Sequence, residues 1–208
     1  GAMVVDALDA VQDIRQADQA VSQSSAASSV FSLADAAAPA ALVQAQADAS
    51  RLISEFFTQP DARTQLFQIF KGGRNDAQPS EQWLSAYESL LNDVQQGQSP
   101  LRVELLRASD LQKLLGAFAE RGLNGERVVY LNADWIQSGA SSHAIELVLA
   151  EEFGHAIDAK LNQGQDSAGD EGHAFASLLF NGAANAVLAG TENDQRTLSV
   201  GGQQISVE

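Results

Sequence analysis

The sequence predicts an α+β fold that is mostly α-helical. Long stretches with apolar residues at helical spacing fill the first hundred residues. Two short β-branched runs, LRVELL at 101–106 and RVVYLN at 127–132, are typical of strands. The closing segment LSVGGQQISV, at 198–207, is typical of a β-hairpin around its two glycines. Hydrophobic residues make up 45% of the 208 residues, which suffices for a sizeable core.

Residues 4–100 are expected to form a helical N-terminal region, and residues 1–3 resemble a remnant of an expression tag on a piece of a longer protein. Apolar spacing, a proline in a first turn and a serine cap place its helices. They are expected at 4–21, 40–57, 60–70 and 80–94. The aromatic residues Trp83, Tyr87 and Trp135 are interpreted as core.

Residues 101–208 are expected to form the second unit, which ends in the C-terminal hairpin. Apolar spacing predicts helices after the first strand and after the second. They are expected at 109–121, 143–161 and 170–180, with Leu111, Leu114, Leu115 and Phe118 as the apolar stripe of the first.

Composition limits the partners. The net charge is −15, from 27 acidic and 12 basic residues, which argues against nucleic acid and anionic membranes. No apolar run reaches the roughly 18 residues of a membrane span, so no membrane insertion is expected. The count of cysteines is 0, which excludes disulfides, thiolate ligands and cysteine nucleophiles.

The stretch LAEEFGHAID, at 149–158, differs by one residue from the H-E-x-x-H helix of zinc proteases. Glu151 and His155 are four residues apart, so they lie on one face of a helix and can reach one ion. Glu152 stands where that motif has its general base. The pattern predicts Glu151 and His155 as metal ligands and Glu152 as the catalytic residue.

A third ligand is expected from the next helix, because a catalytic zinc site uses three protein ligands and an open position. Glu171, 16 residues after His155, is the favoured one. Asp170 is interpreted as a helix cap or as a partner that orients His155. His173 is a weaker candidate for a ligand or an oxyanion donor. An edge-type strand before the helix, the small Gly154 and the acidic Gly169–Gly172 segment favour the site.

The acidic first ligand has consequences. A Glu-His-Glu set carries more negative charge than a His-His-Glu set, so a bound water is less acidic and catalysis weakens. Zinc is the expected ion, with manganese, iron and calcium as alternatives. An ordinary interpretation stays open: Glu151 and His155 form an i,i+4 pair on a helix without an ion.

Three other polar residues are not expected to be metal ligands. His143 is expected at the surface or as a cap. Asp158 is either a partner of the site or a solvated carboxylate. Tyr130 is a minor candidate for stabilising an oxyanion.

The segments VVYLN (128–132), VLAEEFGHAID (148–158), LN (161–162), GDEG (169–172) and TLSVGGQQISVE (197–208) resemble a domain of large secreted bacterial proteins with RTX, haemolysin-type calcium-binding repeats. In that family an acidic residue at the position of Glu151 is usual. The helix is also similar to the H-E-F-G-H-A-x-D helix of anthrax lethal factor and related gluzincins, whose third ligand is a glutamate on a following helix. This resemblance supports Glu171 and implies a zincin-like metallopeptidase fold for 101–208, in a secreted or cell-surface protein.

The resulting hypothesis is a metallopeptidase or peptidase-like domain that acts on a protein or peptide substrate. The alternative is a non-catalytic module of a surface adhesin, with a vestigial or structural metal site.

Overall fold

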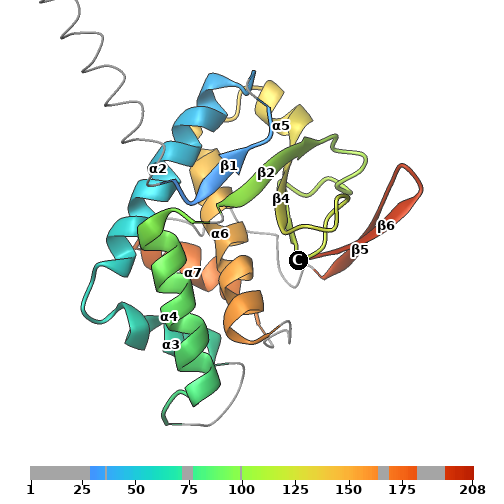
Figure 1. The fold of residues 1–208 in the computed structure, drawn as a ribbon. Coiled ribbons are helices and arrows are strands. Elements are labelled where there is room, and N and C mark those ends of the chain that lie inside the picture. Colours follow the sequence, from blue (N-terminus) through green and yellow to red (C-terminus); the bar gives the residue numbers. More distant parts are fainter. Residues whose placement is uncertain (1–28, 36, 72–76, 99, 164–168, 182–194) are drawn as a thin grey trace, which may run out of the picture.

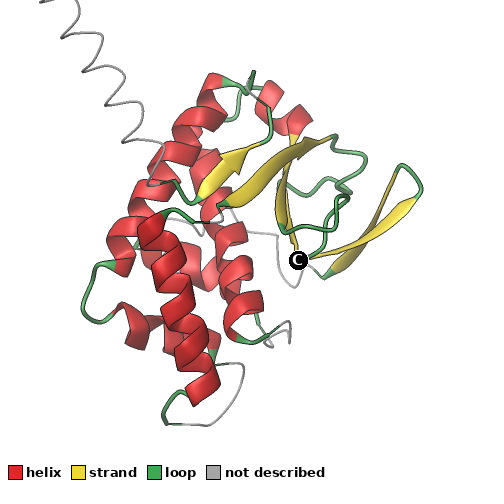
Figure 2. Cartoon of the chain, in the orientation of Figure 1, coloured by secondary structure: helices red, strands yellow, loops and turns green. Residues whose placement is uncertain are grey.

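The computed structural model describes residues 29–35, 37–71, 77–98, 100–163, 169–181 and 195–208. The helix predicted at 4–21 lies outside these ranges. The described chain is α+β and about half helical, with a mixed four-stranded sheet and a small hairpin (Figures 1 and 2). The helices are α2 (Ala40–Phe57), α3 (Ala62–Phe70), α4 (Glu81–Gln96), α5 (Ala133–Gln137), α6 (Ser142–Leu161) and α7 (Glu171–Leu179). The strands are β1 (Phe31–Leu33), β2 (Leu101–Leu106), β3 (Gly116–Ala119), β4 (Val128–Asn132), β5 (Arg196–Val200) and β6 (Gln203–Val207).

The four-stranded sheet has the order β1-β2-β4-β3. Strands β1, β2 and β4 are parallel, and β3 pairs antiparallel to β4 with Phe118 opposite Val129. Strand β4, which precedes the long helix, is therefore interior, and all of its residues are buried. The expectation of an edge-type strand at this position is wrong, because β3 adds to the sheet outside β4.

Side chains of the sheet alternate between two hydrophobic clusters, as the pleat requires. Val103, Phe118, Val129 and Leu131 belong to the large core that the helices complete. Their neighbours Ala117, Ala119, Val128 and Tyr130 face a second cluster with Leu198, Ile205 and Val207 of the β5–β6 hairpin. Helices thus cover one face of the sheet, and the hairpin covers part of the other.

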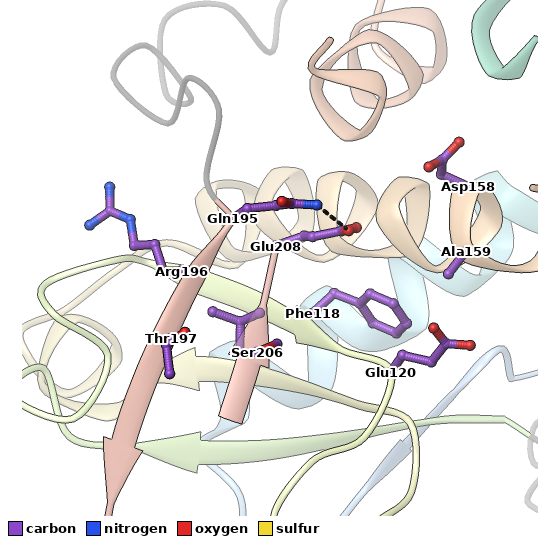
Figure 3. Close-up of a pocket in the computed structure, with 10 residues that line it drawn as sticks. Phe118, Glu120, Asp158, Ala159, Gln195, Arg196, Thr197, Ser206 and Glu208 are labelled. Atoms are coloured by element: carbon purple, nitrogen blue, oxygen red, sulfur yellow. Dashed lines mark hydrogen bonds between the residues drawn. The ribbon is translucent and has the colours of Figure 1, made fainter. Parts of the chain in front are cut away.

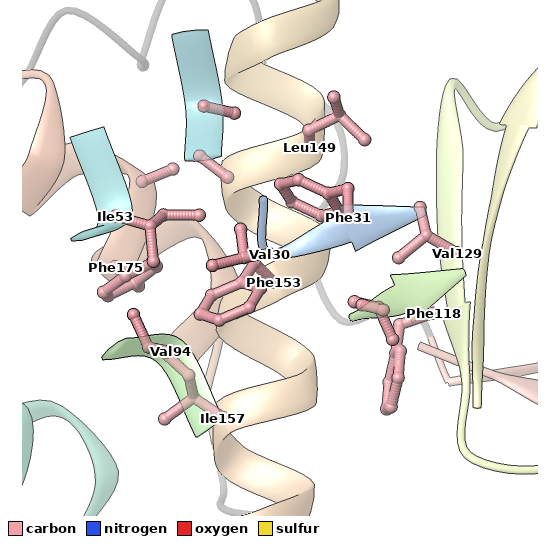
Figure 4. Packing of buried hydrophobic residues seen from close by; sticks show 14 of the residues in the cluster. Val30, Phe31, Ile53, Val94, Phe118, Val129, Leu149, Phe153, Ile157 and Phe175 are labelled. Atoms are coloured by element: carbon pink, nitrogen blue, oxygen red, sulfur yellow. The ribbon is translucent and has the colours of Figure 1, made fainter. Parts of the chain in front are cut away.

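Helix α6 is the centre of the fold. It begins after the N-cap Ser141, whose side chain accepts a hydrogen bond from the backbone N–H of Ala144. It is buried on nearly all sides, because it contacts α2, α4 and α7 as well as the sheet. Its Phe153 stacks edge-on against Phe31, with ring centroids 5.8 Å apart, and also contacts Phe175 (Figure 4).

The N-terminal helices share this core. Helix α2 has the predicted bounds, 40–57, and α3 and α4 lie within two residues of theirs. Ser80 caps α4 as expected, at 3.1 Å from the backbone nitrogen of Trp83. Trp83 and Tyr87 are buried and stacked, which confirms them as core. Within the described residues no helix is both long and apolar enough to cross a membrane.

The helix predicted at 109–121 is wrong. Residues 107–115 form turns, with positive φ at Gln112 and Lys113, and β3 follows. Two consecutive left-handed residues are incompatible with a right-handed helix. The apolar residues at helical spacing instead separate into the two clusters, Phe118 in the large one and Leu111 and Leu114 in the other. Pairing with β4 overrode local propensity.

Candidate metal centre at the crossing of two helices

Helices α6 and α7 cross with their backbones in contact. A Cβ atom built on Gly154 would lie 2.7 Å from the Cα of Gly172, closer than real side chains approach. Glycine at both positions is therefore what allows the crossing. It carries Glu151 and His155 of α6 directly against the start of α7.

His155 lies in this crossing. A Cβ on Gly172 would stand 2.6 Å from its Nε2, so the missing side chain leaves the space that the imidazole fills. Burial lowers the pKa of His155 below its ordinary 6.5, and Asp170 and Asp158 oppose that shift. The imidazole is therefore neutral at pH 7, which is the state that binds metal ions.

Glu152 lies on the side of α6 that faces the sheet edge. A Cβ on Gly116, the first residue of β3, would stand 2.9 Å from its Oε1. The side chain of Glu152 is thus held between α6 and the edge strand, and the residue is only 4% exposed. The turn of about 100° per residue explains why it faces β3 while its neighbours face α7.

Glu151 lies on the α7 side of α6. Its Oε2 is 3.8 Å from Nδ1 of His173, a residue of the first turn of α7. Its backbone carbonyl oxygen would be 2.8 Å from a Cβ on Gly172. The structure thus brings Glu151, His155 and the weaker candidate His173 to one crossing.

Glu171 is the first residue of α7 and is buried. Its Oε1 would stand 3.1 Å from a Cβ on Gly169, whose φ of +150° suits glycine. Asp170 is the N-cap, and its side chain accepts a hydrogen bond of 2.9 Å from the backbone N–H of His173. This confirms the capping interpretation of Asp170.

Helix α6 and the start of α7 are rich in buried carboxylates. Glu151, Glu152, Asp158 and Glu171 are each at most 9% exposed. Asn162 donates a hydrogen bond of 2.6 Å to Asp158, so the solvated interpretation of Asp158 is wrong. Ionised carboxylates gathered in a protein interior favour a bound cation, a proton or hydrogen-bond donors.

Within the described ranges, no group of three or more His, Asp and Glu side chains is placed as a metal site. The Glu151, His155 and Glu171 set therefore stays a prediction. Its donors fit a divalent cation by chemistry, since they combine a neutral imidazole with carboxylate oxygens, and glycines leave room beside each of the two predicted ligands His155 and Glu171.

Two other candidates lie elsewhere. His143 is exposed in the first turn of α6, 3.3 Å from Glu146. Tyr130 is buried in the second cluster, where its hydroxyl accepts a hydrogen bond from the backbone N–H of Leu123.

Two residues that lie beside the site were not placed there by sequence reasoning. Phe118 of β3 and Glu208 exchange backbone hydrogen bonds, and Oε2 of Glu208 lies 3.9 Å from Nδ1 of His155. These contacts join residues 90 and 53 positions apart along the chain, so no local pattern encodes them. The short GAFA run with its leading glycine was the one available signal for β3.

Comparison with protein-family models, with curated proteins and with solved structures finds no match to this chain. The site is therefore interpreted from its own residues.

Proposed function

We propose that this chain is a zincin-like metallopeptidase domain of a secreted bacterial protein, with Glu152 as general base. One observation carries the proposal: three glycines make room for three of the predicted site residues. Gly116 lies against Glu152, Gly172 against His155 and Gly169 against Glu171. Each of these side chains lies where a Cβ atom is missing, so the backbone leaves them room beside α7 and β3.

The ligands proposed for the ion are Glu151, His155 and Glu171. A divalent cation held there supplies Lewis-acid polarisation of a carbonyl and a more acidic water. Zinc suits this donor set, and manganese, iron and calcium are the alternatives. The neutral state of His155 at pH 7, which follows from its burial, leaves a lone pair available for binding.

Glu152 handles the proton. Its carboxylate accepts a proton from the water whose oxygen attacks the carbonyl carbon of the peptide bond. As the C–N bond breaks, Glu152 returns that proton to the leaving nitrogen. Burial between α6 and β3 fixes the position of this carboxylate and limits its access to bulk water. Substrate is expected to be protein or peptide.

The substitution Glu152→Gln tests this role. It keeps the size of the side chain and removes the base, so cleavage of labelled casein by the zinc-loaded protein should fall at least about 100-fold. Zinc content and melting temperature should stay near those of the wild type. Undiminished cleavage by the folded variant would refute the general-base role.

A further inference from the structure

The outer edge of β3 is occupied by the chain itself. The backbone N–H of Phe118 donates to the carbonyl of Glu208 over 2.8 Å, and the N–H of Glu208 donates back over 2.9 Å. Two residues that exchange both hydrogen bonds form a hydrogen-bonded pair of antiparallel strands. Glu208 therefore extends the sheet beyond β3.

The pairing uses the backbone N–H and C=O of a β3 residue that faces away from β4. The carbonyl of Leu115 accepts from the N–H of Asn132, so odd-numbered residues here bond to β4. Alternation along the strand directs the backbone groups of residues 116, 118 and 120 away from β4. An extended peptide that adds to this edge needs the same groups of Phe118 that Glu208 holds.

Glu208 also reaches the candidate metal centre. Its Oε2 lies 3.9 Å from Nδ1 of His155. The same strand β3 begins at Gly116, against Glu152. Beside the pair is a cavity of about 390 Å³, lined by Phe118 and Glu120, by Asp158 and Ala159 of α6, and by the ends of the hairpin strands (Figure 3).

We propose that Val207 and Glu208 act as a built-in competitor for extended peptide on the outer edge of β3. This inference rests on the proposed function, since it names the regulation of that site. The same backbone groups cannot bond Glu208 and a peptide together. Peptide therefore binds only when the end of the hairpin moves off the edge of β3. The strength with which the hairpin holds this edge sets the fraction of molecules in which peptide can bind.

A disulfide lock tests the proposal. The pair Phe118–Glu208 sets a register in which Ala119 lies opposite Val207, in a non-hydrogen-bonded pair with Cα atoms about 4.5 Å apart. That distance suits a disulfide, and the chain has 0 native cysteines. The variant with Ala119→Cys and Val207→Cys is made in a Glu152→Gln background, so binding is measured without cleavage. Ala119→Cys alone is the matched control.

The probe is fluorescein-labelled β-casein, read by fluorescence anisotropy with no added metal ion. The oxidised double variant should bind casein at least about tenfold more weakly than the same protein reduced with a phosphine. Casein binding by Ala119→Cys alone should not change on oxidation. Equal binding by the oxidised and reduced forms would overturn the proposal.

A second pair of variants opens the edge and does not depend on the lock folding. Glu208→Pro removes the N–H that bonds to Phe118, so casein should bind about 3–10-fold more tightly. Glu208→Ala keeps both backbone bonds, so casein should bind it more weakly than it binds Glu208→Pro. Unchanged or weaker binding by Glu208→Pro would equally overturn the proposal.

The two proposals fail in different ways. The peptidase proposal alone would be refuted if casein binding changes as predicted for the lock and for Glu208→Pro, but no metal-loaded protein with Glu152 intact cleaves casein. Casein cleavage that is unaffected by the lock and by Glu208→Pro, each made with Glu152 intact, would refute the competitor alone.

Discussion

Gly154 and Gly172 bring α6 and α7 into backbone contact, since a Cβ on the first would lie 2.7 Å from the Cα of the second. This contact positions His155 against α7 and so sets the geometry of the candidate centre. It also defines where the site is most sensitive to added volume.

Gly154→Ala and Gly172→Ala should each destabilise the protein by about 1–3 kcal/mol, because the added methyl group overpacks the crossing. For a protein of this size that corresponds to about 2–4 °C of melting temperature for each kcal/mol. Thermal unfolding followed by circular dichroism measures it. The double variant should lose less than the sum, because both methyl groups force the same separation of the helices. Melting within about 1 °C of the wild type for both single variants would contradict the tight crossing.

Asp170→Ala should cost about 1 kcal/mol, because the N-cap oxygen that accepts from the N–H of His173 is lost. Asp170→Asn keeps an acceptor and should cost less. Urea unfolding of the two variants compares them. A cost for Asp170→Asn as large as that for Asp170→Ala would show that the cap is not the source of the stability.

Glu146 makes stability depend on pH. Burial raises its pKa above the ordinary 4.5, and the contact with His143 opposes that shift. As pH rises through about 4.5, the unfolded chain loses this proton first, so the folded state loses stability up to the raised pKa. Glu146→Gln should therefore stabilise the protein at pH 7 and have a smaller effect at pH 4.

Urea unfolding at the two pH values measures this difference. His143→Ala should enlarge the loss of stability between pH 4 and 7, because it removes the contact that lowers the pKa of Glu146. An effect of Glu146→Gln that is the same at both pH values would contradict the burial argument.

The sequence predicted the elements with strong local signals. Helix α2 carries apolar residues at helical spacing, and α4 begins directly after the capping Ser80. The hairpin follows from Gly201 and Gly202, whose positive φ angles suit glycine in a tight turn. Each of these signals lies within a few residues of the element that it specifies.

Prediction from the sequence failed for strands whose pairing partners are distant along the chain. Strand β1 has three residues and gains its structure from the parallel contact with β2, 70 residues later. The residues of strand β3 have the apolar spacing of a helix, and pairing with β4 makes them a strand. For the site, helical spacing placed Glu151, Glu152 and His155 on α6, but the contact of Glu208 with His155 has no local signature.

Zinc binding by His155 tests the central claim most directly. Equilibrium dialysis against micromolar zinc, followed by elemental analysis, should give about one ion per chain for the wild type. His155→Ala should lose most of this zinc, whereas His143→Ala, on the exposed first turn of the same helix, should retain it. A wild-type chain without bound zinc, or His155→Ala that binds as much zinc as the wild type, would contradict the account.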